Sequence, residues 1–189
     1  MVELLEAVGR ELAEADVPEQ ELIVVGGAYM ALADRRSMSE DVDALGALTP
    51  ALAAAAQRVA REYGLGERWL NSGPTPFWPA GLDRSSCREV LRAGRLRVLV
   101  PPPEFVFAMK LYSYRPKDFE DLSHLWRACR FPDREAAVAF YWEQYPNEPP
   151  DPYLVTLIDD IEARIERDGI AERTQSPWLF GWDDTQGIH

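Results

Sequence analysis

The apolar run Leu22-Ile23-Val24-Val25 is followed at once by two glycines, Gly26 and Gly27. A continuous run of this kind, rich in β-branched residues, is typical of a buried strand. Glycines at its end let the chain turn sharply and let the backbone approach a ligand, while the following helix start offers N–H groups to a phosphate. The pattern therefore predicts a buried strand that turns into a short helix over about 28–34. A plain turn is the alternative interpretation of the two glycines.

Hydrophobic periodicity predicts the other elements. Helices are expected at 2–15, 50–63, 104–114, 118–129, 133–144 and 151–168, and strands at 41–45, 87–91 and 96–100. The Gly-, Pro- and Trp-rich residues 64–84 are expected to form a long ordered loop. A sheet followed by helices indicates the α+β class. We expect an α+β core over 1–130, a helical extension packed on it over 131–174, and an irregular tail over 175–189.

Composition narrows the class of protein. The chain is 47% hydrophobic, which excludes wholesale disorder, and its net charge of −12 argues against binding nucleic acid over its whole surface. Its two cysteines lack metal-type spacing, and two histidines are too few for a multi-histidine metal site. With no long apolar stretch and no basic leader, the chain is expected to be soluble and cytoplasmic, without a membrane partner.

Asp41 and Asp43 lie two residues apart on a predicted strand. Residues with this spacing point to the same face, so the two carboxylates project together and repel. A divalent cation resolves the repulsion, and Mg²⁺ characteristically takes one or two carboxylates together with substrate phosphates. The dyad therefore indicates a magnesium site. A solvent-facing strand edge is the alternative.

Lys110 and Lys117 are the only lysines in the chain, which otherwise uses arginine for its Lys/Arg residues. In so arginine-rich a chain, two nearby lysines suggest sites that need a compact ammonium for a phosphate or a carboxylate, although chance also explains them. Asp118 and Asp121 are three residues apart on the following helix, so they share a face and can reach Lys110 or Arg115.

A local excess of positive charge lies in the predicted hairpin. Five arginines stand against Glu89, at positions Arg84, Arg88, Arg92, Arg95 and Arg97. The group fits a contact with a nucleic-acid backbone or a triphosphate. It fits equally a solvated face whose arginines pair with acids elsewhere in the chain.

Taken in order, these motifs resemble a known family over about residues 20–127. The matching segments are Val25-Gly26-Gly27-Ala28-Tyr29-Met30, Arg36, Ser39-Glu40-Asp41-Val42-Asp43, Lys110-Leu111 and Arg115-Pro116-Lys117-Asp118-Phe119-Glu120-Asp121-Leu122. The order resembles the polymerase-β-like nucleotidyltransferase fold, and in particular the AbiEii-type bacterial nucleotidyltransferases of toxin–antitoxin and abortive-infection systems. In that fold a later strand usually supplies a third carboxylate. Residues 96–100 contain none, and Glu89 is the nearest candidate.

The resemblance implies a nucleotidyltransferase-like mixed sheet flanked by helices, a nucleoside triphosphate and Mg²⁺. In the site that the resemblance implies, Gly26 and Gly27 hold the phosphates, and Ser39, Arg36 and Lys117 contact the nucleotide. Asp41 and Asp43 bind the metal and are catalytic, and Lys110 and Asp118 are further catalytic residues. The implied activity is transfer of an NMP from an NTP to an RNA, such as tRNA, or to a protein, in a toxin–antitoxin or phage-defence system.

Two other functions remain open. The first is a non-catalytic protein of the same fold that acts as an antitoxin or regulatory partner-binding module. The acidic residues of the last predicted helix suit a basic protein partner: Asp159, Asp160, Glu162, Glu166 and Asp168. The second is a nucleotide-binding sensor, which needs only Gly26, Gly27 and Lys110.

Overall fold

The computed structural model describes residues 1–33 and 41–168. The chain divides into two compact units. The sheet unit consists of Met1–Phe77 and Arg84–Pro101, and the helical unit consists of Trp78–Asp83 and the chain from Pro102 onward. The division falls within three consecutive prolines that directly follow the last strand, whereas the sequence placed the boundary of the core at residue 130. The tail predicted over 175–189 lies outside the described residues.

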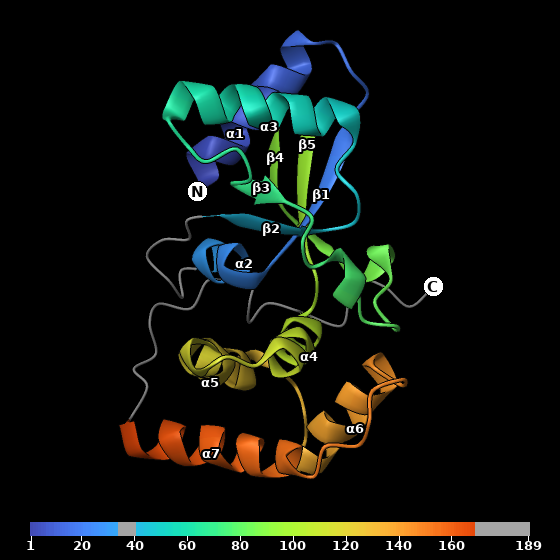
Figure 1. Cartoon of the computed structure of the whole chain (residues 1–189), viewed down its shortest axis with the longest axis vertical. Helices are drawn as coiled ribbons and strands as arrows, with labels where there is room; N and C mark the ends of the chain where they lie inside the picture. Colours follow the sequence, from blue (N-terminus) through green and yellow to red (C-terminus); the bar gives the residue numbers. More distant parts are fainter. Residues whose placement is uncertain (34–40, 169–189) are drawn as a thin grey trace. The chain divides into compact units, whose positions relative to one another are not determined.

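The sheet unit contains a five-stranded mixed sheet, which confirms the predicted α+β class (Figure 1). Its strands, in spatial order, are β3 (Leu70–Asn71), β2 (Val42–Leu45), β1 (Gln20–Val25), β5 (Leu96–Val100) and β4 (Arg88–Ala93). β1 pairs antiparallel with β2 and parallel with β5, and β4 and β5 form the predicted hairpin. β3 was not predicted. It lies in the stretch 64–84 that the sequence indicated as a loop, and it pairs parallel with β2. The same stretch contains the 3₁₀ turn Thr75–Phe77, and a second 3₁₀ turn, Arg84–Ser86, begins at its end.

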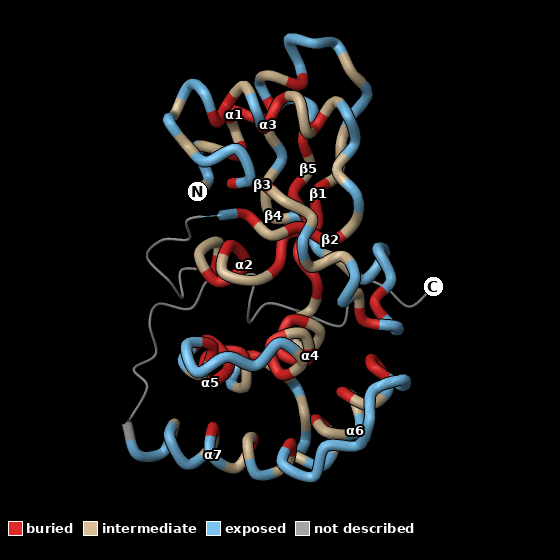
Figure 2. Tube along the Cα trace, viewed as in Figure 1, coloured by how far each residue is buried: buried red, intermediate tan, exposed pale blue. Residues whose placement is uncertain are grey.

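Two helices cover one face of the sheet, namely α1 (Val2–Glu14) and α3 (Pro50–Tyr63) (Figure 1). Alternate strand residues, such as Leu22 and Val24, join the apolar stripes of these helices in one core. α3 begins as its sequence predicts, because the hydroxyl of Thr49 accepts a hydrogen bond from the N–H of Leu52 at 3.2 Å. In Figure 2 the buried residues run along β1 and β5.

On the opposite face of the sheet lie the side chains of the strand residues that alternate with those core residues. Val25 pairs directly with Asp43, so both side chains project from this second face. The short helix α2 (Gly26–Leu32) follows β1 without a connecting loop and lies against β1 and β2. It begins at Gly26 rather than at residue 28 as predicted, so the first glycine is also the first helical residue.

The described part of the helical unit contains four α-helices, and all four were predicted. They are α4 (Pro103–Ser113), α5 (Phe119–Ala128), α6 (Arg134–Gln144) and α7 (Tyr153–Asp168), with a 3₁₀ turn at Pro116–Asp118 before α5. An aromatic cluster that includes Phe107, Trp126 and Phe131 joins α4, α5 and the chain after α5. Among the described residues, none of the helices combines the length and the apolarity that crossing a bilayer requires.

Candidate functional site

Gly26 and Asp43 lie close together at the end of β1, where the sequence places the glycine turn and the acidic strand. Gly26 has a φ of +64°, a left-handed conformation that residues with a side chain rarely adopt. A Cβ atom added to Gly26 would lie only 2.8 Å from Oδ2 of Asp43. Glycine is therefore favoured here for two reasons, its backbone conformation and the closeness of the Asp43 carboxylate.

The other oxygen of the Asp43 carboxylate is bound by Asn71, the last residue of β3. Nδ2 of Asn71 donates a hydrogen bond to Oδ1 of Asp43 at 3.0 Å, and Oδ1 of Asn71 accepts one from the N–H of Gly73 at 2.8 Å. Asn71 is opposite Asp43 in the β2–β3 pairing, so the strands bring the two side chains together. Sequence reasoning missed Asn71, because a two-residue strand has no detectable periodicity.

Asp41 lies one residue before β2 and is exposed. The predicted strand was 41–45, but the observed strand begins at Val42, whose N–H donates to the carbonyl of Trp69. The alternation of side chains along β2 therefore determines the face of the sheet from which Asp43 projects. It does not determine this for Asp41, which lies just before the first residue of the strand. Two aspartates at this point of the chain still provide the one or two carboxylates that Mg²⁺ uses beside phosphates.

Asp41 and Asp43 are the described carboxylates that could contribute to a metal site at this end of the sheet. Within residues 1–33 and 41–168, no group of three acidic, histidine or cysteine side chains is placed to hold a metal. Glu89, the nearest candidate for a third carboxylate, accepts hydrogen bonds from Arg92 and Arg97 instead. Asp41 and Asp43 are thus the residues that would hold Mg²⁺ here, with further ligands from phosphate and water.

Lys110 and Asp118, the predicted catalytic pair of the helical unit, are in contact with one another. Nζ of Lys110 lies 3.1 Å from Oδ1 of Asp118 and 2.8 Å from Oδ2 of Asp121. Arg115 binds the second oxygen of Asp118 through Nε at 2.8 Å. The expectation that Asp118 and Asp121 share a face and reach Lys110 or Arg115 is confirmed. Lys110 is only 6% exposed, so its ammonium is enclosed by its two carboxylate partners.

Asp118 is held ionised by this cluster. Burial by itself raises the pKa of a carboxyl group, but the hydrogen bond from Arg115 and the charge of Lys110 outweigh it, and the pKa of Asp118 lies below its ordinary value. The ammonium of Lys110 and the carboxylates of Asp118 and Asp121 are buried with direct partners, whereas the Arg115 side chain is 57% exposed. These ion pairs link α4, the 3₁₀ turn and α5, as a structural ion-pair cluster does.

Two of the expected nucleotide contacts, Arg36 and Ser39, lie outside the described residues. Gly27 is in the first turn of α2 and is partly buried. Lys117, which lies in the 3₁₀ turn before α5, is exposed and forms no ion pair with a described residue. The two lysines of the chain therefore differ sharply, because one is enclosed by aspartates and the other faces solvent.

The arginines of the β4–β5 hairpin form ion pairs with acidic residues. Arg97 binds Glu21 at 2.7 Å and Glu89 at 2.8 Å, and Arg92 binds Glu89 at 2.9 Å. Further pairs are Arg84 with Glu21, Arg92 with Glu19 and Arg95 with Asp16. Hydrogen bonds from Arg92 and Arg97 lower the pKa of Glu89 to about 2. Arg84, Arg92, Arg95 and Arg97 thus pair with acidic residues, as the second of the two alternatives expects.

The predicted site residues form two clusters, each within one unit. Gly26, Asp43 and Asn71 belong to the sheet unit, whereas Lys110 and Asp118 belong to the helical unit. No protein-family model, curated protein or solved structure matches this chain significantly.

Proposed function

We propose that the protein is a Mg²⁺-dependent nucleotidyltransferase that moves an NMP from an NTP to an RNA or protein acceptor. The observation that carries the proposal is the contact between Gly26 and Asp43. A glycine turn that opens a helix and an acidic strand are brought together at one place, as the sequence resemblance implies. Asn71, bound to Asp43, orients the carboxylate further.

Within this proposal, residues of the sheet unit hold the nucleotide. Asp41 and Asp43 bind the ion, and the glycine backbone allows the phosphates to approach closely. A bound Mg²⁺ would supply neutralisation of the phosphate charge while an acceptor oxygen attacks the α-phosphorus of the NTP and pyrophosphate leaves. Asn71 acts as a positioning residue, because its amide fixes one oxygen of Asp43 and leaves the other directed toward Gly26. In the same proposal, the protein is a component of a toxin–antitoxin or phage-defence system.

A transfer assay with wild type and the two acidic-site variants tests this function. The protein is incubated with each α-labelled NTP, Mg²⁺ and either total RNA or a cell lysate, and labelled products are separated by size. Label should enter RNA or protein only with Mg²⁺, and Asp41→Asn or Asp43→Asn should abolish it. The matched control is Glu67→Gln, which removes a charge from an exposed residue of the same unit. Equal transfer by Asp41→Asn, Asp43→Asn and wild type would contradict the proposal.

One observation favours a second candidate, a non-catalytic protein of the same fold that acts as an antitoxin or regulatory partner. Lys110 is enclosed by two aspartates, so its ammonium is committed to carboxylates. Calorimetric titration with each Mg-NTP separates the two candidates. Nucleotide binding that requires Asp43 supports the transferase, whereas the second candidate predicts no binding by wild type.

A further inference from the structure

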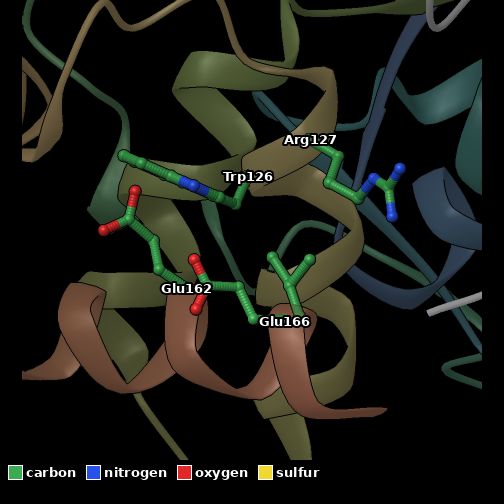
Figure 3. A pocket seen from close by; sticks show the side chains of 5 residues that line it. Trp126, Arg127, Glu162 and Glu166 are labelled. Atoms are coloured by element: carbon green, nitrogen blue, oxygen red, sulfur yellow. The ribbon is translucent and has the colours of Figure 1, made fainter. Parts of the chain in front are cut away.

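A groove in the helical unit lies between α5 and α7 and has a volume of about 330 Å³ (Figure 3). Its walls are formed by Trp126 and Arg127 from α5 and by Glu162, Ile165 and Glu166 from α7. The volume is at the lower end of the range for ligand sites in proteins. The groove combines an aromatic wall, an apolar side chain and two carboxylates.

The two glutamates carry negative charge that the described chain does not neutralise. Glu162 and Glu166 are four residues apart on α7, so they share one face and repel each other. Neither forms an ion pair with a described residue. Figure 3 shows both carboxylates on the side of the groove below the Trp126 ring, whereas the guanidinium of Arg127 is directed away from them.

Trp126 is held in position by the aromatic cluster behind it. Its ring centroid lies 5.5 Å from that of Phe107 and 6.0 Å from that of Phe131. An indole fixed in this way offers its surface to a ligand at little cost in conformational entropy. The face of an indole attracts cations more strongly than that of any other aromatic side chain.

We propose that this groove binds an arginine side chain of a basic protein partner. A planar guanidinium can stack on the Trp126 ring while its N–H groups reach the carboxylates of Glu162 and Glu166, and its aliphatic stem packs against Ile165. Lysine would satisfy the charge but not the stacking geometry. The net charge of −12 favours the approach of a basic partner. This proposal does not depend on nucleotide transfer.

The test uses short capped peptides and the full chain. Gly-Arg-Gly-Arg-Gly, its lysine analogue and its glutamine analogue are titrated against ¹⁵N-labelled protein, and the indole N–H resonance of Trp126 is followed. Its resonance is assigned by its loss in Trp126→Phe. The arginine peptide should shift this resonance in a saturable way, the lysine peptide should bind more weakly, and the glutamine peptide should leave it unchanged.

Matched variants identify the groove as the binding site. Glu162→Gln combined with Glu166→Gln should weaken binding of the arginine peptide by about tenfold, as expected for the loss of charge-assisted contacts. Glu143→Gln, which changes an exposed glutamate on α6, should bind like wild type. Equal binding by the double variant, or an equal shift with the glutamine peptide, would overturn the proposal.

Two further outcomes would identify a different occupant and so also overturn it. A shift of the Trp126 resonance that depends on protein concentration, without peptide, would indicate a second copy of the chain. Peptide binding that appears only after removal of residues 169–189 would indicate that the chain's own C-terminal residues fill the groove.

Discussion

The carboxylate of Asp43 occupies the space that a side chain on Gly26 would need. Oδ2 of Asp43 is 2.8 Å from the position of a Cβ atom on Gly26, a separation that Cβ atoms essentially never show. Gly26 directly follows the central strand β1 and Asp43 belongs to its neighbour β2, so the antiparallel pairing of β1 with β2 creates the contact. This contact at the proposed nucleotide site can therefore be tested by measuring the stability of variants, without an activity assay.

Gly26→Ala should destabilise the protein more than Gly64→Ala. The two glycines have nearly equal φ angles, +64° and +67°, so the backbone strain of about 1–2 kcal/mol is common to both. They differ in their surroundings, because a Cβ on Gly64 meets nothing within 4 Å. The excess loss in Gly26→Ala, measured by denaturant unfolding, therefore reports the contact with Asp43.

The control for this prediction is a double-mutant cycle. In an Asp43→Ala background the excess cost of Gly26→Ala should disappear, since the opposing carboxylate is gone. Equal costs for Gly26→Ala with and without Asp43 would show that the contact does not explain the glycine.

Asn71→Asp should make the stability of the protein sensitive to Mg²⁺. The substitution replaces the amide that donates to Asp43 with a second carboxylate, and the two charges then repel. We expect a lower Tm than wild type in EDTA, and a larger rise in Tm on addition of millimolar Mg²⁺. Differential scanning fluorimetry provides the measurement, with Asn71→Ala as the control that loses the hydrogen bond but adds no charge. If Mg²⁺ raised the Tm of both variants equally, Asn71 would not lie at a cation site.

The sequence predicted the sheet unit where its patterns are local. The apolar run before Gly26, the hairpin of β4 and β5 and the cap of α3 by Thr49 each depend on residues that are neighbours in the chain. Asn71 was missed, because β3 is short and lies among Gly, Pro and Trp residues that indicate a loop. It becomes a strand only because β2 is available to pair with it.

Ion pairs between residues far apart in the sequence also could not be predicted from local sequence patterns. Glu21 meets Arg97 because β1 and β5 pair in parallel, a register that no local motif specifies. The spacing of Asp118 and Asp121 did predict their contact with Lys110. Their burial was not predicted, because it depends on how α4 and α5 pack.

The stability of the protein should fall as the pH drops below about 4, in part because of Asp118. The pKa of Asp118 lies below its ordinary value in the folded protein, so its contribution is present above the unfolded pKa, about 3.9, and is lost as the pH falls through the folded pKa. Asp118→Asn should be less stable than wild type at pH 7 and should show a flatter decline in acid. The control is Asp160→Asn, an exposed residue of α7. Parallel acid profiles for wild type and Asp118→Asn would contradict the prediction.

Lys110→Ala should destabilise the protein strongly, whereas Lys117→Ala should change its stability by no more than about 0.5 kcal/mol. Removing Lys110 leaves two buried carboxylates without their ammonium, a change that costs about 3–5 kcal/mol when one partner of a buried ion pair is lost. Adding Asp118→Asn and Asp121→Asn to Lys110→Met should restore much of the loss, because no buried carboxylate is then left without its ammonium and Arg115, which loses Asp118, is largely exposed.

The same variants separate a structural role of Lys110 from a role in binding nucleotide. Lys110→Arg keeps the charge but replaces a compact ammonium with a planar group, so it should retain only part of the stability. If Lys110 is structural, the triple variant will fold and bind Mg-NTP with the affinity of wild type in a calorimetric titration. Lys110→Ala that is as stable as Lys117→Ala, yet loses nucleotide binding, would contradict the structural role and would instead favour Lys110 as a ligand of the triphosphate.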